Sequence, residues 1–500
     1  ASAESNQSIE KAPASEINSV HLRDNAELYN VYDDSGIVTM YLTVSRGNDS
    51  ENTNHSWAEI NHYSAYDYTA MGVARYQVNG LLQVGDENGP LAGEVGYDTH
   101  APNATVQIRG QTSSRYTQKN YKVKLKKNKG SWRGQRTIAL NKHQGEGLRF
   151  RNKMAYDLIK GIDQMMGLRT QFVHLYVKDL TDSASGVFED YGLYTQVEQL
   201  NKTALKAHGV DPNGQLYKIN SFEFYRYEDV IRLTTDPAYD QTAFEKHLEI
   251  KGDSDHSKLI KMLDVLNDES SSMDDELFVT YFDKENIAYW MAFQLLTGNT
   301  DTQNRNVYLY SPQNSSKWYL WDWDNDGMLR RREREIINFS DSESWERGVS
   351  NYWGNVLFRR CLQTQSYRDL LDTAMKELYA YMNEERIQSM MEHYRSVTEK
   401  YVWQMPDRMN VPITHDEYEE VLKSIWPEID ENYNYYWESY RKPMPFYIGE
   451  PQVVNGSLLL TWDPSYNFEI ENIYYTVELA KDYLFTTTFF RQENLILPEL

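Results

Sequence analysis

The sequence contains one cysteine, Cys361, among 500 residues. A single thiol excludes an internal disulfide framework and any zinc site built from several cysteines. The histidines show neither an H-E-x-x-H motif nor another paired spacing, which argues against a zinc enzyme. No run approaches the roughly 18 consecutive apolar residues of a transmembrane helix, so we expect no membrane span.

Basic residues are scarce relative to acidic ones. The chain has 51 Lys and Arg against 74 Asp and Glu, a net charge of -23, and a pI near 5.0. Nucleic-acid-binding proteins normally carry the opposite sign, so we expect no nucleic-acid partner. The chain is long, since 500 residues exceed what one hydrophobic core usually fills. We therefore expect one large domain or two lobes, with room for an additional module.

The first residues, ASAESNQSIEKAPASE, are small and polar and do not begin with methionine. This composition is typical of what remains after a signal peptide is removed, so we expect a secreted or cell-surface bacterial protein. Residues 1–34 are polar and aperiodic, which predicts a linker.

Residues 35–205 are rich in predicted strands. Apolar and polar residues alternate over 37–44, 104–110 and 120–127, and the last two runs are separated by a connection that suits a hairpin. A helix is predicted over 149–167, ending at Gly167, followed by strands at 172–179 and 192–200.

Residues 206–442 are predominantly helical, with three-to-four spacing of apolar residues over 257–268, 285–296 and 367–403. The pattern predicts an α+β, two-lobed fold with a groove between a β-rich N-lobe and a helical C-lobe. After Pro443 and Pro445, residues 443–500 read as short strands. This all-β segment resembles an incomplete fibronectin type III module.

Two polar stretches stand close together in the second half. GNTDTQNRNVYLY (298–310) places Asp301 and Asn306 on one turn, and WDWDNDG (321–327) follows it. Phosphoryl transfer needs magnesium held by carboxylate and amide oxygens, and protein kinases supply them from an Asp and an Asn with this loop spacing plus a later Asp. A predicted hairpin between the two stretches returns Asp324 towards Asp301.

A calcium loop is the alternative interpretation of the second stretch. Glu333 stands at position twelve from Asp322, as an EF-hand requires, and Gly327 occupies the central position. Trp323 and the basic run after Leu329 fit poorly with EF-hand helices.

Five segments occur in the order found in the CotH family, which comprises spore-coat-type atypical protein kinases of bacteria with relatives among fungal surface invasins. They are IRGQTSSRYTQKNYKVKL, LRFRNKMAYDLIKGIDQMMGLRTQFVHLYV, YGLYTQVEQLNK, GNTDTQNRNVYLY and KWYLWDWDNDGM. The chain resembles this family from about residue 35 to 440. The resemblance implies a kinase-like fold and ATP with Mg²⁺ or Mn²⁺. It also implies phosphorylation of Ser or Thr on secreted, surface or coat proteins.

The resemblance also implies roles for individual residues. Asp301 is expected to be the catalytic acid that orients or deprotonates the acceptor hydroxyl. Metal ligands are expected at Asp324, Asp322 and Asn306. Lys119 is expected to contact the phosphates, with Lys122 and Lys124 as rivals that equally fit a solvated edge strand.

The remaining expected nucleotide contacts come from the first half of the chain. Arg109, Ser113 and Ser114 lie where a phosphate-covering turn is expected, and Glu198 is expected to reach the sugar or base. Asp157 is the helix acid expected to pair with the lysine.

Two functions follow from this reasoning. The first is an exported, metal-dependent kinase acting on a secreted or surface protein. The second is a surface adhesion or binding protein that keeps the fold without turnover. The sequence leaves the acceptor protein and the oligomeric state open.

Overall fold

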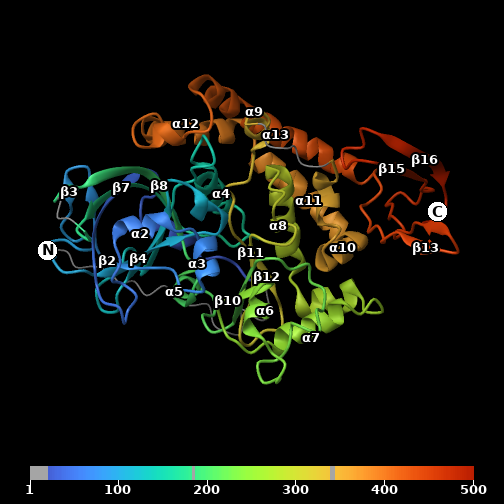
Figure 1. Cartoon of the computed structure of the whole chain (residues 1–500), viewed down its shortest axis with the longest axis horizontal. Coiled ribbons are helices and arrows are strands. Elements are labelled where there is room, and N and C mark those ends of the chain that lie inside the picture. The colour runs from blue at the N-terminus through green and yellow to red at the C-terminus, as the bar shows by residue number, and fades with distance from the viewer. Residues whose placement is uncertain (1–20, 183–185, 338–343) are drawn as a thin grey trace.

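A computed structural model describes residues 21–182, 186–337 and 344–500. Figure 1 shows a large sheet at one end of the molecule, helices in the middle, and the C-terminal strands at the opposite end. Buried apolar residues form two clusters, one inside the large sheet and a larger one among the helices. The mixed α and β content agrees with the predicted α+β class.

The large sheet closes on itself, because β1 pairs with β2 on one side and with β7 on the other. The short β3 (Gly89–Pro90) extends it at β2. The closing strands are β1 (Ile37–Ser45), β7 (Thr170–Asp179), β8 (Glu189–Glu198), β6 (Thr137–Asn141), β5 (Asn120–Leu125), β4 (Ala104–Arg109) and β2 (Val78–Asp86). The predicted hairpin is confirmed as the antiparallel pair β4 and β5.

Alternation along these strands sends one set of side chains into the smaller core and the other set outwards. Val106, Ile108 and Val123 are fully buried inside the closed sheet, whereas Arg109 and Lys122 lie on the outer face. Which face carries which residues decides the site described below.

A second sheet lies in the other half of the molecule, in the order β10-β9-β11-β12. Its strands are β9 (Gln215–Ile219), β10 (Leu248–Ile250), β11 (Val307–Ser311) and β12 (Tyr319–Asp322). The predicted hairpin in this region is confirmed, because β11 and β12 pair antiparallel with Val307 opposite Asp322. Strands β9 and β10 were not predicted.

The helices pack mainly around this second half. They are α2 (Trp57–His62), α3 (Ala65–Met71), α4 (Arg151–Ile159), α5 (Lys202–Ala207), α6 (Gln241–Glu245), α7 (Ser257–Leu266), α8 (Lys284–Thr297), α9 (Arg331–Ile336), α10 (Val356–Gln363), α11 (Gln365–Tyr381), α12 (Glu384–Val402) and α13 (His415–Ser439). Short 3₁₀ helices are η1 (Ala26–Asn30), η2 (Thr112–Arg115), η4 (Ser344–Glu346), η5 (Gly348–Tyr352) and η6 (Asp407–Asn410), and η3 (Met273–Tyr281) is a π-helix.

Helix α8 is the central helix of the larger core, and every residue from Asn286 to Thr297 is buried. Asp283 caps its start by accepting a hydrogen bond from the backbone N of Asn286 (2.8 Å). Gly298 ends it in the left-handed conformation, with φ of 62°, which glycine adopts without steric cost. The chain therefore leaves α8 sharply and enters the loop that carries Asp301.

The observed elements differ from the predicted ones at several ends. Helix α4 stops at Ile159 instead of Gly167, because residues 160–165 continue as turns. Residues 148–168 belong to the larger core although they precede the predicted lobe boundary near 205. The lobe and domain boundaries themselves stay predictions.

The predicted linker 1–34 is only partly covered, since residues 1–20 lie outside the described residues. Residues 21–34 do not form a free linker. Leu22 and Leu28 are buried, and Asp24 Oδ1 pairs with His208 Nδ1 at 2.7 Å. The two leucines explain the difference, because they join the packed structure.

The C-terminal segment contains two separate two-stranded ladders, β13 (Gln452–Val454) with β14 (Ser457–Leu459) and β15 (Tyr475–Ala480) with β16 (Thr488–Leu495). Its Tyr466 packs against Trp353 of the helical half, with ring centroids 4.8 Å apart. The fibronectin type III interpretation of this segment stays a prediction.

Candidate functional site

The site begins at the open end of the β11–β12 hairpin. Because Val307 pairs with Asp322, the residues just outside the ladder, Asn306 and Trp323, lie side by side. The Asp301 loop (298–306) enters this end from α8, and the acid turn (322–327) leaves it. One hairpin and one helix end therefore hold both polar stretches in place.

Asp301 and Asn306 are joined directly. Asn306 Nδ2 donates to the backbone O of Asp301 (2.9 Å) and to its Oδ2 (3.2 Å). Desolvation raises the pKa of Asp301, and the charge of Asp324 acts in the same direction. The Asp301 side chain is still 55% exposed, so its carboxylate is open to an incoming group.

Asp324 and Asp326 lie on the acid turn and supply two further carboxylates. Asp324 has a left-handed backbone, with φ of 58°, and its Oδ1 accepts a long hydrogen bond from the backbone N of Asp326 (3.4 Å). Asn299 Nδ2 donates to the backbone O of Asp324 (3.3 Å), which ties the acid turn to the Asp301 loop. Burial, and then repulsion from Asp326, raises the pKa of Asp324 to about 7.

Asp322 differs from its neighbours because both of its oxygens already have donors. Oδ2 accepts from Gln294 Nε2 (2.9 Å) and Oδ1 from Asn325 Nδ2 (2.6 Å). The residue is 2% exposed, and burial raises its pKa to about 6. Both Asp322 oxygens are therefore engaged within the protein, and Asp326 lies beside Asp324 on the same turn.

Two cations face the acid turn from different sheets. Arg109, at the end of β4, has its guanidinium carbon 6.0 Å from the Trp323 ring centroid, and Lys218 Nζ of β9 lies 5.5 Å from it. Both are close enough to Asp324 for its charge to affect their pKa, although burial is the larger influence and lowers each. Arg109 Nη1 also donates to Asn141 Oδ1, which fixes the guanidinium.

Further cations lie near these two. Burial lowers the pKa of Lys122 on the outer face of β5, as do the positive charges of Lys124, Lys251, Arg109 and Arg75. These cations are partly balanced by Glu249, whose Oε1 lies 2.6 Å from Lys251 Nζ and whose charge acts on Lys218.

Lys119 lies elsewhere. It does point inwards, as its strand position predicts, and is 6% exposed. Its Nζ donates to the backbone O of Ser114 (2.6 Å), near Asp67. Because the sheet is closed, its inner face packs against its own core, and the outer face carries the side chains that meet the second sheet.

Ser113 and Ser114 are engaged in local hydrogen bonds. Ser114 is fully buried, and its Oγ donates to Gln111 O (2.5 Å) and accepts from the backbone N of Ala65 (2.9 Å). Ser113 Oγ accepts from Asn120 Nδ2 (3.1 Å). These hydrogen bonds stabilise the turn itself. The proposed site therefore does not include the two serines.

Glu198 belongs to a buried ion-pair network. Its Oε2 lies 2.5 Å from Arg169 Nη2, and its Oε1 lies 2.7 Å from His208 Nε2. Despite the opposing effect of burial, these partners lower the pKa of Glu198 to about 2. With 1% exposure it offers no free oxygen to a nucleotide.

Asp157, the expected partner of the phosphate-contacting lysine, pairs with other lysines instead. Its Oδ1 lies 3.0 Å from Lys153 Nζ and from Lys160 Nζ. The acid therefore stabilises the surroundings of α4 and not Lys119.

The calcium-loop alternative is excluded by Glu333. This residue is fully buried, where it accepts from the backbone N of Gly147 (2.9 Å) and pairs with Arg151 (3.3 Å) and Arg330 (2.8 Å). A carboxylate held by two arginines cannot close a calcium loop.

Sequence reasoning missed three residues of the site: Asp326, Lys218 and His143. His143 Nδ1 lies 4.0 Å from Asp326 Oδ2, and burial lowers the pKa of His143. Asp326 had a signal, since it stands two residues after Asp324. His143 and Lys218 reach the site only through long-range strand pairing.

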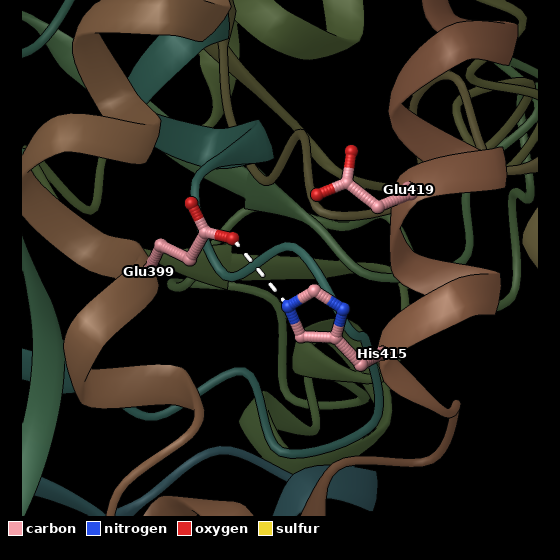
Figure 2. Close-up of side chains that lie close together, drawn as sticks. All are labelled: Glu399, His415 and Glu419. Atoms are coloured by element: carbon pink, nitrogen blue, oxygen red, sulfur yellow. Dashed lines mark ion pairs between the residues drawn. The ribbon is translucent and has the colours of Figure 1, made fainter.

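A different group of possible metal ligands lies between α12 and α13. Glu399, His415 and Glu419 have ligand atoms within 4.8 Å of one another, and Figure 2 shows the three side chains facing each other across two helices. Arg395 already supplies a positive charge there, because its Nη2 pairs with Glu399 (3.1 Å) and with Glu419. We therefore assign no metal to this group.

The donor set at the hairpin end suits a hard cation. Asp324, Asp326, Asp301 and Asn306 offer only oxygen donors apart from one amide nitrogen, as Mg²⁺ and Mn²⁺ prefer. Asn325, between the two acids, has a buried Oδ1 without a hydrogen-bond partner within the described ranges. An unpartnered buried oxygen is costly and fits a site that holds a cation.

A site with acidic oxygens on one side and cations on the other is the class that binds metal and phosphate together. The family whose sequences match is described as CotH kinase protein, over residues 106–436. The chain belongs to this family. A comparison with curated proteins found no match. Across the described segments, no helix has the length and hydrophobicity needed to cross a membrane.

Proposed function

We propose that this chain is an ATP-dependent protein kinase of the CotH type, phosphorylating Ser or Thr of a secreted or surface protein. The observation that carries the proposal is the hairpin end, where Asp301 and Asn306 meet Asp324 and Asp326. Arg109 and Lys218 face this acidic group from two different sheets. Family membership supports the kinase assignment, and the geometry supports the choice of residues.

The proposed roles follow from charge. Arg109, Lys122 and Lys218 bind the triphosphate, because cations between two sheets neutralise its oxygens in a partly desolvated place. Asp324 and Asp326 hold the divalent cation, which neutralises charge that develops on the phosphate oxygens. Asn306 keeps the Asp301 carboxylate oriented through its hydrogen bond.

The transfer itself needs one proton acceptor. The acceptor hydroxyl oxygen forms a bond to the γ-phosphorus as the bond to the β-phosphate oxygen breaks, and ADP leaves. Asp301 takes the hydroxyl proton, and its raised pKa makes it a better base than an ordinary aspartate.

Transfer of label tests this function. ATP labelled on the γ-phosphate, and separately on the α-phosphate, is incubated with an acceptor protein with and without Mg²⁺. We expect only the γ label to move, only with metal, and not with Asp301→Asn or Asp324→Asn. Asp229→Asn, an exposed acid far along the chain, is the matched control and should keep full transfer.

Other outcomes separate the alternatives. Movement of the α label would assign nucleotide transfer. Binding of ATP without movement of either label would favour the adhesion or binding protein.

A further inference from the structure

A hollow lies beside the Asp301 loop, lined by the end of α8, by α9, by η5 and by α13. It is open to solvent. Gly298, Asn299 and Thr300 line it immediately before Asp301, and Gly327 lines it just after Asp326. The hollow is therefore adjacent to the proposed transfer site.

Four arginines line this arginine hollow: Arg330, Arg331, Arg334 and Arg347. Two of them are paired with acids, since Arg330 lies 2.8 Å from Glu333 and Arg331 pairs with Glu431. Arg331 Nη2 also donates to Asn432 Oδ1 (2.7 Å). These two guanidinium groups are held by the protein itself.

Arg334 and Arg347 are different. Within the part of the chain that the structure describes, neither guanidinium forms an ion pair or donates a hydrogen bond. Arg347 Nε is buried without a partner, while its guanidinium stacks 4.4 Å from the Tyr435 ring centroid. A buried donor without an acceptor, such as Arg347 Nε, is costly, and an anion would supply the acceptor. The half-buried Arg334 guanidinium is available to the same anion.

The acids in the hollow do not cancel this charge. Glu346 and Glu428 are its two acidic lining residues. Glu428 is 8% exposed and accepts from the backbone N of Arg331 (3.0 Å), and burial raises its pKa to about 7. Glu428 Oε1 also lies 3.8 Å from Arg331 Nε, so it is shared with an arginine that already has a partner. Among the described lining residues, Glu346 is then the acid that remains to face Arg334 and Arg347.

The hollow is also electrostatically connected to the transfer site. The charge of Arg334 is close enough to Asp301 to lower its pKa, opposing the effect of desolvation. A polypeptide whose hydroxyl reaches Asp301 places its neighbouring side chains at this hollow.

We propose that the arginine hollow binds an anionic side chain, a carboxylate or a phosphate monoester, next to the hydroxyl that receives the phosphate. Arg334 and Arg347 supply the bidentate donors that such groups prefer. This inference rests on the proposed kinase function and adds that the acceptors are acidic or already phosphorylated around the target residue.

The test compares peptides that share one serine acceptor. A neighbouring position carries Glu, phosphoserine, Gln or Lys, and kcat/KM is measured for each. We expect Glu or phosphoserine to exceed Gln by about tenfold or more, the size of a charge-assisted hydrogen bond, and Lys to be poorest. The Glu and phosphoserine arms distinguish the two sources of the anion.

Two variants place the effect in the hollow. Arg334→Gln and Arg347→Gln should each reduce the preference for Glu over Gln about tenfold, judged as a ratio so that a general loss of activity cancels. Arg332→Gln is the matched control, because it lies on the same helix but pairs outwards with Glu335 (2.7 Å) and Glu420. It should keep the full preference.

Direct binding separates this proposal from the function it rests on. Fluorescence anisotropy of the labelled peptides, without ATP, should show the same order of affinity even if no phosphate is transferred. Binding without transfer overturns the kinase function and keeps the anion site. An equal affinity for Glu, Gln and Lys peptides, or a preference unchanged in both arginine variants, overturns the anion site.

Discussion

Asp322 and Asp324 are two residues apart, yet their surroundings give them different roles. Asp322 accepts hydrogen bonds from two amides, whereas Asp324 stands beside a second acid and two cations. The same carboxyl group is thus a positioning residue at one place and an expected ligand at the other.

Substitution by asparagine separates these roles. Asp322→Asn turns one acceptor oxygen into a donor that faces an amide donor, so we expect a loss of roughly 1–3 kcal/mol in unfolding free energy. Asp324→Asn removes like-charge repulsion and should leave the stability unchanged or slightly higher, while abolishing transfer. Thermal unfolding and label transfer, measured on both variants, check this. Equal loss of stability in the two would contradict it.

The Glu198–His208 pair predicts a pH dependence of stability. The charges of Asp24 and Glu198 raise the pKa of His208 from 6.5 to about 10, although burial opposes them. The charges of His208 and Arg169 lower the pKa of Glu198 from 4.5 to about 2. The histidine contribution is complete below pH 6.5 and is lost as the pH rises through 10. The glutamate contribution is complete above pH 4.5 and is lost as the pH falls through 2.

Glu198→Gln tests that pair. Breaking a buried ion pair costs roughly 3–5 kcal/mol, so the variant should be much less stable than the wild type. The difference in unfolding free energy should be largest between pH 4.5 and 6.5 and shrink on either side. Denaturant unfolding from about pH 2 to about pH 10, which covers both pKa shifts, measures this difference. A difference that does not vary with pH would show that the pair is not ionised.

At the scale of elements, the β11–β12 hairpin and α8 determine which residues meet. The hairpin was predictable because two short runs rich in apolar and aromatic residues follow each other, joined by the polar connection 312–318. The hairpin brings Asn306 next to Trp323. The proximity of Asp301 to Asp324 follows from this local geometry. The residues that this local pairing brings together could therefore be predicted from the sequence.

On the basic side of the site, the sequence predicted Arg109 and left Lys119, Lys122 and Lys124 as alternatives, but it did not indicate Lys218. Whether Lys119 or Lys122 meets the second sheet depends on closure of the first sheet through the β1–β7 and β6–β8 pairings. These pairings join strands far apart in the chain, and no local pattern specifies them. The same reason explains why Lys218, His143 and the partners of Glu198 were missed.

Substitution of Lys218 and of Lys119 tests which lysine contacts the nucleotide. Lys218→Met removes a cation beside the acid turn and should raise the KM for ATP roughly 10- to 100-fold, the range of a charge-assisted hydrogen bond. Lys119→Met removes only the bond to Ser114 O. It should cost about 1 kcal/mol of stability and leave the KM for ATP unchanged. Steady-state kinetics and thermal unfolding check both, and the opposite pattern would restore Lys119 to the site.

At the scale of the whole molecule, the two hydrophobic cores meet at the proposed nucleotide site. Arg109 comes from the sheet around the smaller core, and Asp324 follows a strand of the larger core. A ligand that contacts both sides links the two halves, so its binding should stabilise the whole chain.

Thermal unfolding measures this link. ATP with Mg²⁺ at about 100 times its Kd should stabilise the chain by roughly 2.7 kcal/mol, and therefore raise the Tm. ATP alone or Mg²⁺ alone should have a much smaller effect, and Asp324→Asn should remove the metal dependence. A Tm shift that is the same with and without metal would contradict the proposed ligands.

The most direct measurement is a crystal structure with a non-hydrolysable ATP analogue and Mn²⁺, in which anomalous scattering locates the metal. We predict a manganese peak between Asp324 and Asp326. The terminal phosphate should lie within reach of Asp301 on one side and of Arg109 and Lys218 on the other. A nucleotide bound elsewhere, or a manganese peak only at Glu399, His415 and Glu419, would contradict it.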